Sequence, residues 1–273
     1  MMTYLVTGSN GMIGSQIYKE LRRMGWNTHS LNTSEIDECN TQKDLQSLIT
    51  SKIRSVNGVF HVGAIADTSD FSADVLYYNY HITKLIINSC SHWNVPLIFS
   101  STQMVKGRSE VGYPENIYGW SKVMCEDYGL AKAPYILPFI ALRYTNVYGP
   151  GEEAKGRNAS LAYQGWLSKR IDLWDAKRDF VYVKDVVSAN IYAMNNIKTS
   201  GTYWVASGET RSVMDLVGNM GDDITIGTKS ENSAPPWFQW ETSCDPNRFM
   251  SGWTPKYTIE SGTADYLNYL KNN

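Results

Sequence analysis

The sequence predicts an α/β protein, a doubly wound parallel sheet followed by a smaller C-terminal lobe. Three observations carry this prediction. Strand-like and helix-like segments alternate from residue 3 to about Gly149, as they do in parallel sheets covered on both faces. Gly8, Gly11 and Gly14 stand between the first strand-like and the first helix-like segment. After about Gly149 the alternation breaks, and the segments become shorter and richer in loops.

The first part of the alternation runs to residue 64. Residues 3–8, TYLVTG, read as a short buried strand. Residues 11–25 read as a helix, because apolar residues recur at helical spacing from Ile13 to Leu21 and Gly25 stands where a C-terminal cap is expected. The next elements are a weak strand at 27–32, a helix at 41–51 and a strand at 56–64.

The second part of the alternation begins with a long helix at 74–93, which ends before Pro96. The elements after it are a strand at 96–102, a helix at 116–132 and a strand at 139–149. We therefore expect one lobe at 1–150 and a second lobe over most of 151–273.

Composition and charge narrow the function. The net charge of −2 over 273 residues favours neither nucleic acid nor an anionic membrane as a partner. No apolar run is long enough to span a bilayer and no leader-like segment precedes the first strand, so we expect a cytoplasmic enzyme. The four cysteines form no C-x-x-C and no metal-type cluster, so we expect buried thiols and no metal site.

The three glycines between Thr7 and Ser15 predict a dinucleotide-binding turn of the Rossmann type. In such a turn one glycine makes the tight bend, the next lets the backbone approach a pyrophosphate, and the last lets helix and strand pack closely. The helix N-terminus then holds the diphosphate. The alternative is a tight turn without a ligand. The residues of the turn predicted to bind the cofactor are Gly8, Asn10, Gly11, Met12 and Ile13.

The residues after the second strand leave the choice between NAD and NADP open. An acidic residue there would bind the adenosine ribose and favour NAD. This chain has Asn32, whose amide can bond a ribose hydroxyl without repelling a 2′-phosphate. Asp37 lies where an adenine amino group could be bound. The alternative for Asp37 is a cap on the helix at 41–50.

Three tyrosines are followed four residues later by a lysine, which puts both side chains on one helix face. Only Tyr118 and Lys122 begin a helix that follows a strand ending in hydroxyls, which include Thr102. The other two pairs are Tyr80/Lys84, placed among large apolar residues, and Tyr128/Lys132, placed on a different helix face. Tyr118 and Lys122 are therefore the predicted catalytic pair.

YGWSK after SST, together with TGSNGMIG, resembles the short-chain dehydrogenase/reductase superfamily, and within it the extended branch that acts on nucleotide sugars. The matching motifs cover nearly the whole chain: HVGAIADT, RYTNVYGPG, RDFVYVKDV and SGWTPKYTIESG. HVGAIADT and the Lys-Gly of NVYGPGEEAKGRNAS resemble the ADP-glycero-manno-heptose 6-epimerases. The resemblance implies an NAD(P)-binding Rossmann domain at 1–150 and a mainly substrate-binding lobe at 151–273, with a segment near 176–195 returning to the core.

The resemblance also implies an NAD(P)-dependent nucleotide-sugar epimerase that oxidises a sugar carbon transiently and reduces it again. Tyrosine is a poor base because its pKa is near 10, and a nearby cation lowers that pKa. Lys122 is expected to do this and to hold the nicotinamide ribose. Thr102 would orient the substrate oxygen, and Lys155 would be a second acid/base, the alternative being an exposed loop lysine. The further residues that the resemblance assigns are Gly63, Ala64 and Asn79 to the cofactor, and Ser101, Asn146 and Arg178 to the substrate.

Several alternatives remain open at this point. The segment LNTSEIDECN looks more like dTDP-4-dehydrorhamnose reductases, so an NADPH-dependent 4-keto nucleotide-sugar reductase is the first alternative. A dehydratase needs an acidic residue beside the hydroxyl, where this chain has Gln103. A non-catalytic cofactor-binding regulator would be expected to have lost Tyr118 or Lys122. The helices at 79–93 and 117–132 are expected to pair with their copies in a homodimer or a higher homo-oligomer.

Overall fold

The computed structural model describes residues 1–106, 112–135, 138–196, 198–234, 238–242 and 244–273. The chain forms two compact units. The first unit comprises Met1–Arg143 and Val187–Tyr203, and the second comprises Tyr144–Val186 and Trp204–Asn273. The first unit thus ends at Arg143 rather than at residue 150, and its returning segment starts at Val187 rather than near residue 176.

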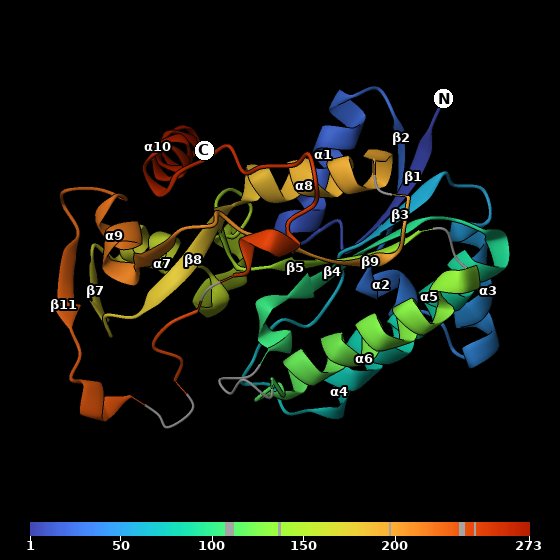
Figure 1. Ribbon diagram of the computed structural model, residues 1–273, viewed down its shortest axis with the longest axis horizontal. Coiled ribbons are helices and arrows are strands. Elements are labelled where there is room, and N and C mark those ends of the chain that lie inside the picture. The colour runs from blue at the N-terminus through green and yellow to red at the C-terminus, as the bar shows by residue number, and fades with distance from the viewer. Residues whose placement is uncertain (107–111, 136–137, 197, 235–237, 243) are drawn as a thin grey trace. The chain divides into compact units, whose positions relative to one another are not determined.

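A six-stranded sheet forms the centre of the first unit (Figure 1). Its strands, in spatial order, are β2 (Asn27–Leu31), β1 (Thr3–Thr7), β3 (Gly58–His61), β4 (Leu97–Thr102), β5 (Phe139–Tyr144) and β9 (Gly201–Val205). The pairs β1–β2, β1–β3 and β3–β4 are parallel. Because the order reverses beside β1, the sheet is doubly wound, which confirms the predicted fold class.

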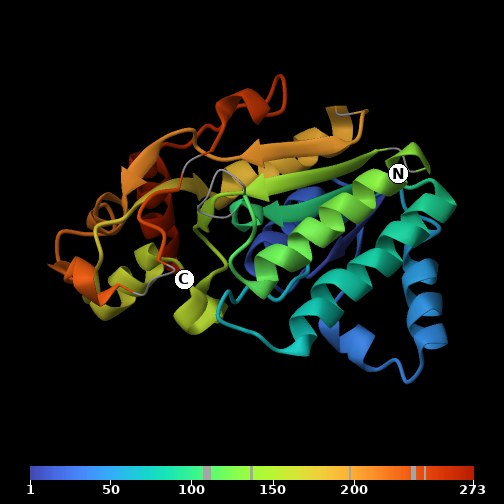
Figure 2. The same ribbon diagram turned by 60° about the horizontal axis from the view of Figure 1, so that its bottom comes forward.

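Helices cover both faces of this sheet. Those on one face are α3 (Gln42–Ile53), α5 (Ile82–Trp93) and α6 (Ile117–Lys132), and those on the other are α1 (Met12–Arg23) and α8 (Val183–Asn196), as Figures 1 and 2 show. In α1 the predicted apolar stripe is real, because Ile17 and Leu21 are fully buried. Gly25 follows that helix with φ +80°, the left-handed conformation that glycine adopts without strain.

Three local features differ from the expected elements. The helix expected at 74–93 is α4 (Ala73–Leu76), then a π-helical turn over Tyr77–His81, and then α5. A short helix, α2 (Thr33–Asp37), follows β2 where none was expected. The strand expected at 139–149 is split into β5 and β6 (Asn146–Tyr148), which belong to different sheets. The apolar run predicted one strand because it continues across the break at Thr145.

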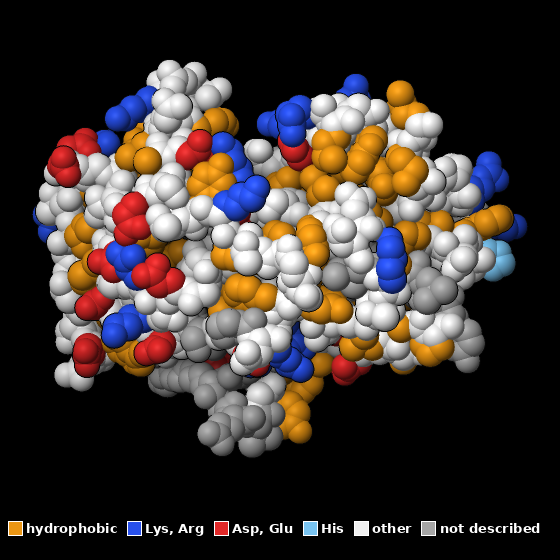
Figure 3. All heavy atoms as spheres, turned by 45° about the horizontal axis from the view of Figure 1, so that its top comes forward, with side chains coloured by type: hydrophobic (Ala, Val, Ile, Leu, Met, Phe, Trp, Pro, Cys, Tyr) orange, Lys and Arg blue, Asp and Glu red, His pale blue; other side chains and the backbone are white. Residues whose placement is uncertain are grey.

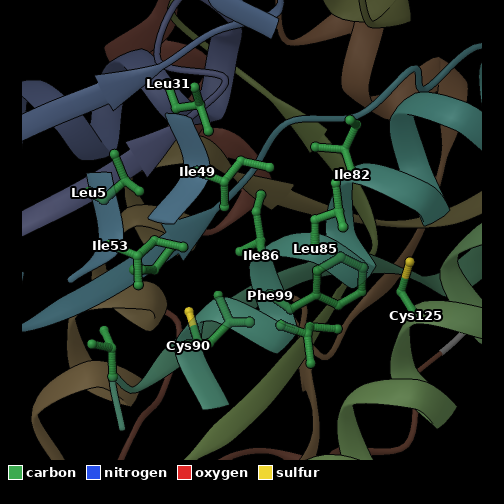
Figure 4. Packing of buried hydrophobic residues seen from close by; sticks show 14 of the residues in the cluster. Leu5, Leu31, Ile49, Ile53, Ile82, Leu85, Ile86, Cys90, Phe99 and Cys125 are labelled. Carbon is green, nitrogen blue, oxygen red and sulfur yellow. The ribbon is translucent and has the colours of Figure 1, made fainter. Parts of the chain in front are cut away.

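Aliphatic side chains from the sheet and from α3 and α5 form the hydrophobic core of the first unit (Figure 4). Ile49, Ile86 and Phe99 meet there, all fully buried. Cys90 and Cys125 lie in the same cluster, where burial raises the pKa of the Cys125 thiol to about 11. All four cysteines of the chain are free; Cys90 and Cys125 are buried as expected, whereas Cys39 and Cys244 are only half-buried.

The second unit is built from two small sheets. One contains β10 (Thr210–Ser212), β8 (Lys177–Tyr182) and β6; the other pairs β11 (Thr225–Thr228) with β7 (Arg170–Leu173). Its helices are α7 (Leu161–Ser168), α9 (Val213–Gly218) and α10 (Ile259–Asn272), besides the start of α8. Several of the chain's many aromatic side chains serve its core, since Tyr148, Tyr182 and Tyr266 are almost completely buried.

On the face that Figure 3 shows, acidic side chains of the described residues gather mainly at the left, where basic side chains lie among them. Within the described parts of the chain, no helix has both the length and the apolar character that crossing a membrane requires.

Candidate functional site

In the glycine-rich turn between β1 and α1, Gly8 and Gly14 stand at positions where the fold leaves no room for a Cβ atom. Gly8 has φ +63°, and a Cβ there would lie 2.8 Å from the Cα of Gly63. A Cβ on Gly14 would collide with the carbonyl oxygen of Gly8. These two glycines therefore let the turn pack against the segment that follows β3 and against the start of α1.

Gly11 is different, because the chain's own packing does not demand a glycine there. A Cβ on Gly11 would lie 3.4 Å from the Gly8 carbonyl oxygen, its nearest neighbour, and the backbone is extended at φ −83° and ψ 170°. Gly11 is exposed and is the N-cap of α1; no side chain caps this helix and its first turn holds no acidic residue. An open surface above free helix N–H groups fits a dinucleotide diphosphate.

The residues after β2 tie that turn to a polar cluster. Asn32 Oδ1 accepts a hydrogen bond from Ser9 Oγ at 3.1 Å. The Asn32 backbone N–H donates to Glu35, whose carboxylate also pairs with Lys52 at 2.5 Å. Sequence reasoning missed Glu35, an acidic side chain three residues beyond the expected position. The Asn32 side-chain oxygen is thus engaged by Ser9.

Asp37 ends the short helix α2 and accepts a hydrogen bond from the hydroxyl of Tyr78 at 2.6 Å. That bond raises the pKa of Tyr78 to about 12. The alternative for Asp37, a cap on the following helix, is wrong. Thr41 caps α3, with its side chain accepting from the Asp44 N–H at 3.1 Å.

Tyr118 lies in the first turn of α6, which Asn116 caps by accepting from the Gly119 N–H at 2.7 Å. Burial raises the pKa of the Tyr118 phenol to about 12, and a side-chain hydrogen bond with Thr102 acts in the opposite direction. Thr102 ends β4 and is itself fixed by accepting from the Met104 N–H at 3.2 Å. The structure thus brings the predicted tyrosine and threonine together.

Lys122 is 2 % exposed and lies one helical turn from Tyr118. Its Nζ donates to the carbonyl oxygen of Ser100 at 2.8 Å and lies 5.9 Å from the centre of the Tyr118 ring. Burial lowers the pKa of Lys122 to about 8. In this geometry the pKa of Tyr118 is raised and not lowered, because loss of hydration outweighs the hydrogen bond with Thr102. The expected effect of Lys122 on that pKa stays a prediction.

The rival tyrosine–lysine pairs lie elsewhere on the helices. The hydroxyl of Tyr128 donates to Asn88 at 2.6 Å, and the Tyr80 ring packs edge-on against Tyr128, 6.5 Å between centroids. Lys84 lies over the same Tyr128 ring at 5.7 Å. These groups pair with one another between α5 and α6, so neither tyrosine shares the surroundings of Thr102.

Ser101 is one of the predicted substrate contacts, and its substrate role stays a prediction. It is 2 % exposed, and its hydroxyl donates to Glu126 Oε1 at 2.5 Å. Glu126 is also buried and pairs with Arg143 at 2.5 Å. The Ser101 hydroxyl is therefore committed to a buried ion pair that sequence reasoning did not find, because its members come from β4, α6 and β5.

Asn79 joins the segment after β3 to the helix that carries Tyr118. Its side chain makes a two-way contact with the backbone of Ile65, accepting from the N–H at 2.8 Å and donating to the carbonyl at 2.9 Å. It also donates to Ser121 Oγ at 3.1 Å. Ile65 directly follows Gly63 and Ala64, the predicted cofactor contacts, so Asn79 holds that segment in place.

The remaining predicted residues belong to the second unit. Asn146 donates to the carbonyl of Asp179 at 3.2 Å. Arg178 donates to the carbonyls of Lys177 and Gln239, and burial lowers its pKa to about 10. Lys155 is exposed; desolvation by the surrounding protein lowers its pKa, and the Glu152 carboxylate opposes that effect. Among the described residues, no acidic side chain pairs with Arg178.

Comparison with known proteins gives consistent results. Residues 4–206 match the family described as NAD dependent epimerase/dehydratase. A relative from Fusobacterium nucleatum, named ADP-L-glycero-D-manno-heptose-6-epimerase, is 28 % identical, with 97 % of each chain covered.

Solved structures show the same fold. The ADP-L-glycero-D-manno-heptose-6-epimerase of Helicobacter pylori matches with a TM-score of 0.84 and 24 % identity over 100 % of this chain and 97 % of that one. The UDP-glucose 4-epimerase of Thermotoga maritima, solved with UDP-glucose, matches with a TM-score of 0.82 and 22 % identity over 99 % of each chain.

Proposed function

The chain belongs to the NAD dependent epimerase/dehydratase family, and from that premise we propose that it is a nucleotide-sugar epimerase. The family match confirms the resemblance stated from the motifs. The relatives named as epimerases of ADP-heptose and of UDP-glucose support the nucleotide sugar as the substrate class. A cytoplasmic location is part of the proposal, and the four free thiols support it.

One observation carries the proposal: Tyr118 and Thr102 share a hydrogen bond while Lys122 lies one turn away, buried and without a carboxylate partner among the described residues. A phenol and a hydroxyl on one substrate oxygen can move its proton and orient it. Bound NAD would accept hydride from the sugar carbon and return it. The residues that would hold NAD are the turn at Gly8 and Gly11, the N–H groups of Met12 and Ile13, and Lys122.

The reaction requires Tyr118 to act as a base, although burial holds the pKa of its phenol near 12. Loss of the substrate proton to Tyr118 is favoured when a positive charge stands close to the phenolate. Lys122 supplies such a charge below its pKa of about 8. We therefore expect turnover to depend on both groups, with Lys122 acting on Tyr118 only when the site is filled.

Epimerisation also needs a proton donor for the other face of the carbonyl intermediate. We assign this role to Lys155, which the motif match indicates and whose pKa is lowered by desolvation. The alternative is a phosphate contact. Lys155→Met should stop epimerisation if the lysine transfers protons, and should raise KM with little change in kcat if it binds phosphate. A variant with unchanged kcat would remove Lys155 from the chemistry.

The test of the function is incubation of the purified protein with ADP-heptose and UDP-hexose substrates, followed by NMR of the sugar. An epimerase inverts one carbon with no net change in NAD(P)H. A 4-keto reductase consumes NADPH stoichiometrically, and a dehydratase releases water and leaves a keto sugar. Mass spectrometry of the acid-denatured protein identifies whether NAD or NADP copurifies. Failure to invert any sugar carbon, with NADPH consumed instead, would replace this proposal by the reductase.

We also propose that the protein forms a homodimer through α5 and α6. Trp120 and Met124 of α6 are exposed, at 41 % and 37 %, and Leu76 and Tyr77 before α5 are exposed at 41 % and 42 %. Large apolar side chains on neighbouring helices are typical of a surface that a partner covers. Sedimentation should show a dimer at micromolar concentration, and Met124→Glu should shift it to monomer. A wild-type chain that stays monomeric contradicts the proposal.

A further inference from the structure

A line of buried polar groups in the first unit takes no part in the proposed reaction. It starts at Thr7, at the end of β1 beside the glycine-rich turn, and continues through His61 at the end of β3. It then passes Thr83 on α5 and reaches Asn79 on the π-helical turn. Each of these four residues is at most 3 % exposed.

The direction of the first hydrogen bond follows from its neighbours. Thr7 Oγ1 accepts from the backbone N–H groups of Val62 and Gly63, each at 3.1 Å. A hydroxyl oxygen has two lone pairs, and both are then used. The Thr7 proton must therefore go to His61 Nδ1, which lies 2.6 Å away. His61 Nδ1 is an acceptor and carries no proton.

The rest of the line follows from that assignment. A neutral imidazole whose Nδ1 accepts carries its proton on Nε2. This N–H donates to Thr83 Oγ1 at 2.7 Å, and the Thr83 hydroxyl donates to the carbonyl oxygen of Asn79. Protonation of His61 would aim a second N–H at Thr7 Oγ1, whose lone pairs are occupied. Burial and the charge of Lys122 agree, since they lower the pKa of His61 to about 3.

The line ends on the residue that holds the catalytic helix. The Asn79 side chain contacts the backbone of Ile65 in both directions and also donates to Ser121 Oγ. Ser121 Oγ in turn donates to the carbonyl oxygen of Tyr118 at 2.7 Å. A displacement of Asn79 is thus passed to the segment after β3 and to the first turn of α6.

We infer that His61 is a positioning residue: as the neutral Nε2–H tautomer it links the end of β1 to Asn79, and through Asn79 it fixes the backbone that carries Tyr118. The kinetic consequence rests on the proposed function, whereas the tautomer and the positions of the backbone do not. Other residues could fill the same volume, but an apolar one would leave the Thr7 hydroxyl without an acceptor.

The kinetic test removes one hydroxyl from the line. Thr83→Val keeps the shape of the side chain but neither accepts from His61 nor donates to Asn79, whereas Thr83→Ser keeps both bonds. We expect kcat to fall about tenfold in Thr83→Val, with KM within about twofold, and to recover in Thr83→Ser, because displaced catalytic groups lower the rate more than binding. Ser89→Ala is the matched control, since Ser89 is a buried hydroxyl on α5 that bonds Gln46 outside the line.

A second readout needs no turnover. Amide hydrogen exchange at Ile65, whose N–H donates to Asn79, should speed up in Thr83→Val and in His61→Phe but not in Ser89→Ala. The ¹⁵N spectrum of His61 should show the neutral Nε2–H tautomer at pH 5 to 7. An Nδ1–H tautomer, or equal exchange in all three variants, overturns the inference. If no sugar is epimerised but these two readouts hold, the proposed function fails and the positioning role stands.

Discussion

The two units stabilise their buried charges in different ways. In the first unit Glu126 is paired with Arg143, so opposite charges meet inside the chain. In the second unit Asp179 accepts from the hydroxyls of Thr145 and Ser207 and from the N–H groups of Ser207 and Gly208. Its neighbour Arg178 donates only to carbonyls. Among the described residues, neither Asp179 nor Arg178 has a partner of opposite charge.

The difference suggests two roles: the chain itself neutralises the Glu126–Arg143 pair, whereas Arg178 is left for a ligand to neutralise. The hydrogen bonds described around Tyr118 and Asn79 are made by residues of the first unit, so the positions of Tyr118 and Thr102 are set by that unit's own packing. Arg178 keeps a charge that no acidic side chain in the described part of the chain neutralises, and burial makes that charge costly. We expect such a cation to gain most when an anionic substrate group reaches it.

The largest expected effect concerns the hydroxyl of Tyr118. Tyr118→Phe keeps the ring and removes only the group that exchanges protons, so kcat should fall by roughly 10²- to 10⁴-fold. The fold and the affinity for NAD should stay nearly unchanged, as calorimetric titration would show. Near-normal turnover would show that the Tyr118 hydroxyl does not transfer the substrate proton.

The contrast between the arginines can be tested directly by a matched pair of variants. Arg143→Met leaves Glu126 buried and unpaired, so the free energy of unfolding should fall by about 3–5 kcal/mol. Arg178→Met leaves no buried carboxylate behind and should keep the wild-type stability, while KM for a nucleotide sugar rises. Urea unfolding and steady-state kinetics measure the two effects. Equal losses of stability would contradict the distinction between the units.

Lys122 departs from the pairing of buried opposite charges in the first unit, because no carboxylate of the described residues forms an ion pair with it. Its pKa is about 8 in the folded chain against an ordinary value of 10.5. The unfolded chain therefore binds more protons between pH 8 and 10.5, and the wild type gains stability as pH rises through that window. Lys122→Met should raise the free energy of unfolding at pH 7 by up to about 3 kcal/mol and abolish turnover. The stability difference should shrink between pH 8 and 10.5, and a constant difference would refute the assignment.

The smallest expected effect is a difference between Gly14→Ala and Gly11→Ala in stability and in NAD affinity. Gly14→Ala should destabilise the fold, because its Cβ would collide with the Gly8 carbonyl oxygen. Gly11→Ala should leave the melting temperature nearly unchanged and weaken NAD binding about tenfold, because the methyl group takes space that the pyrophosphate needs. Thermal unfolding and NAD titration of both variants give the comparison. Unchanged NAD affinity in Gly11→Ala would reject the position of the diphosphate.

Sequence reasoning predicted the sheet from the alternation of strands and helices, and it paired Tyr118 with Lys122 from their spacing of four residues. It grouped Tyr118 with Thr102 because the helix follows a strand that ends in hydroxyls. It missed the Ser101–Glu126–Arg143 cluster, since those residues meet only after β4, α6 and β5 have packed. The π-helical turn was missed because one extra residue in a turn leaves the apolar pattern nearly unchanged. The raised pKa of Tyr118 was missed because burial, which sets it, is a property of the packed chain.

The interleaved order of the two units also bears on how the chain folds during synthesis. The sheet of the first unit is completed by β9, which adds beside β5 only after all of residues 144–186 have been made. Until then β5 is an open sheet edge, and open edges pair readily with other chains. The nascent protein therefore cannot finish its first unit before it starts its second. A chaperone that shields the β5 edge would be needed most while the ribosome translates the second unit.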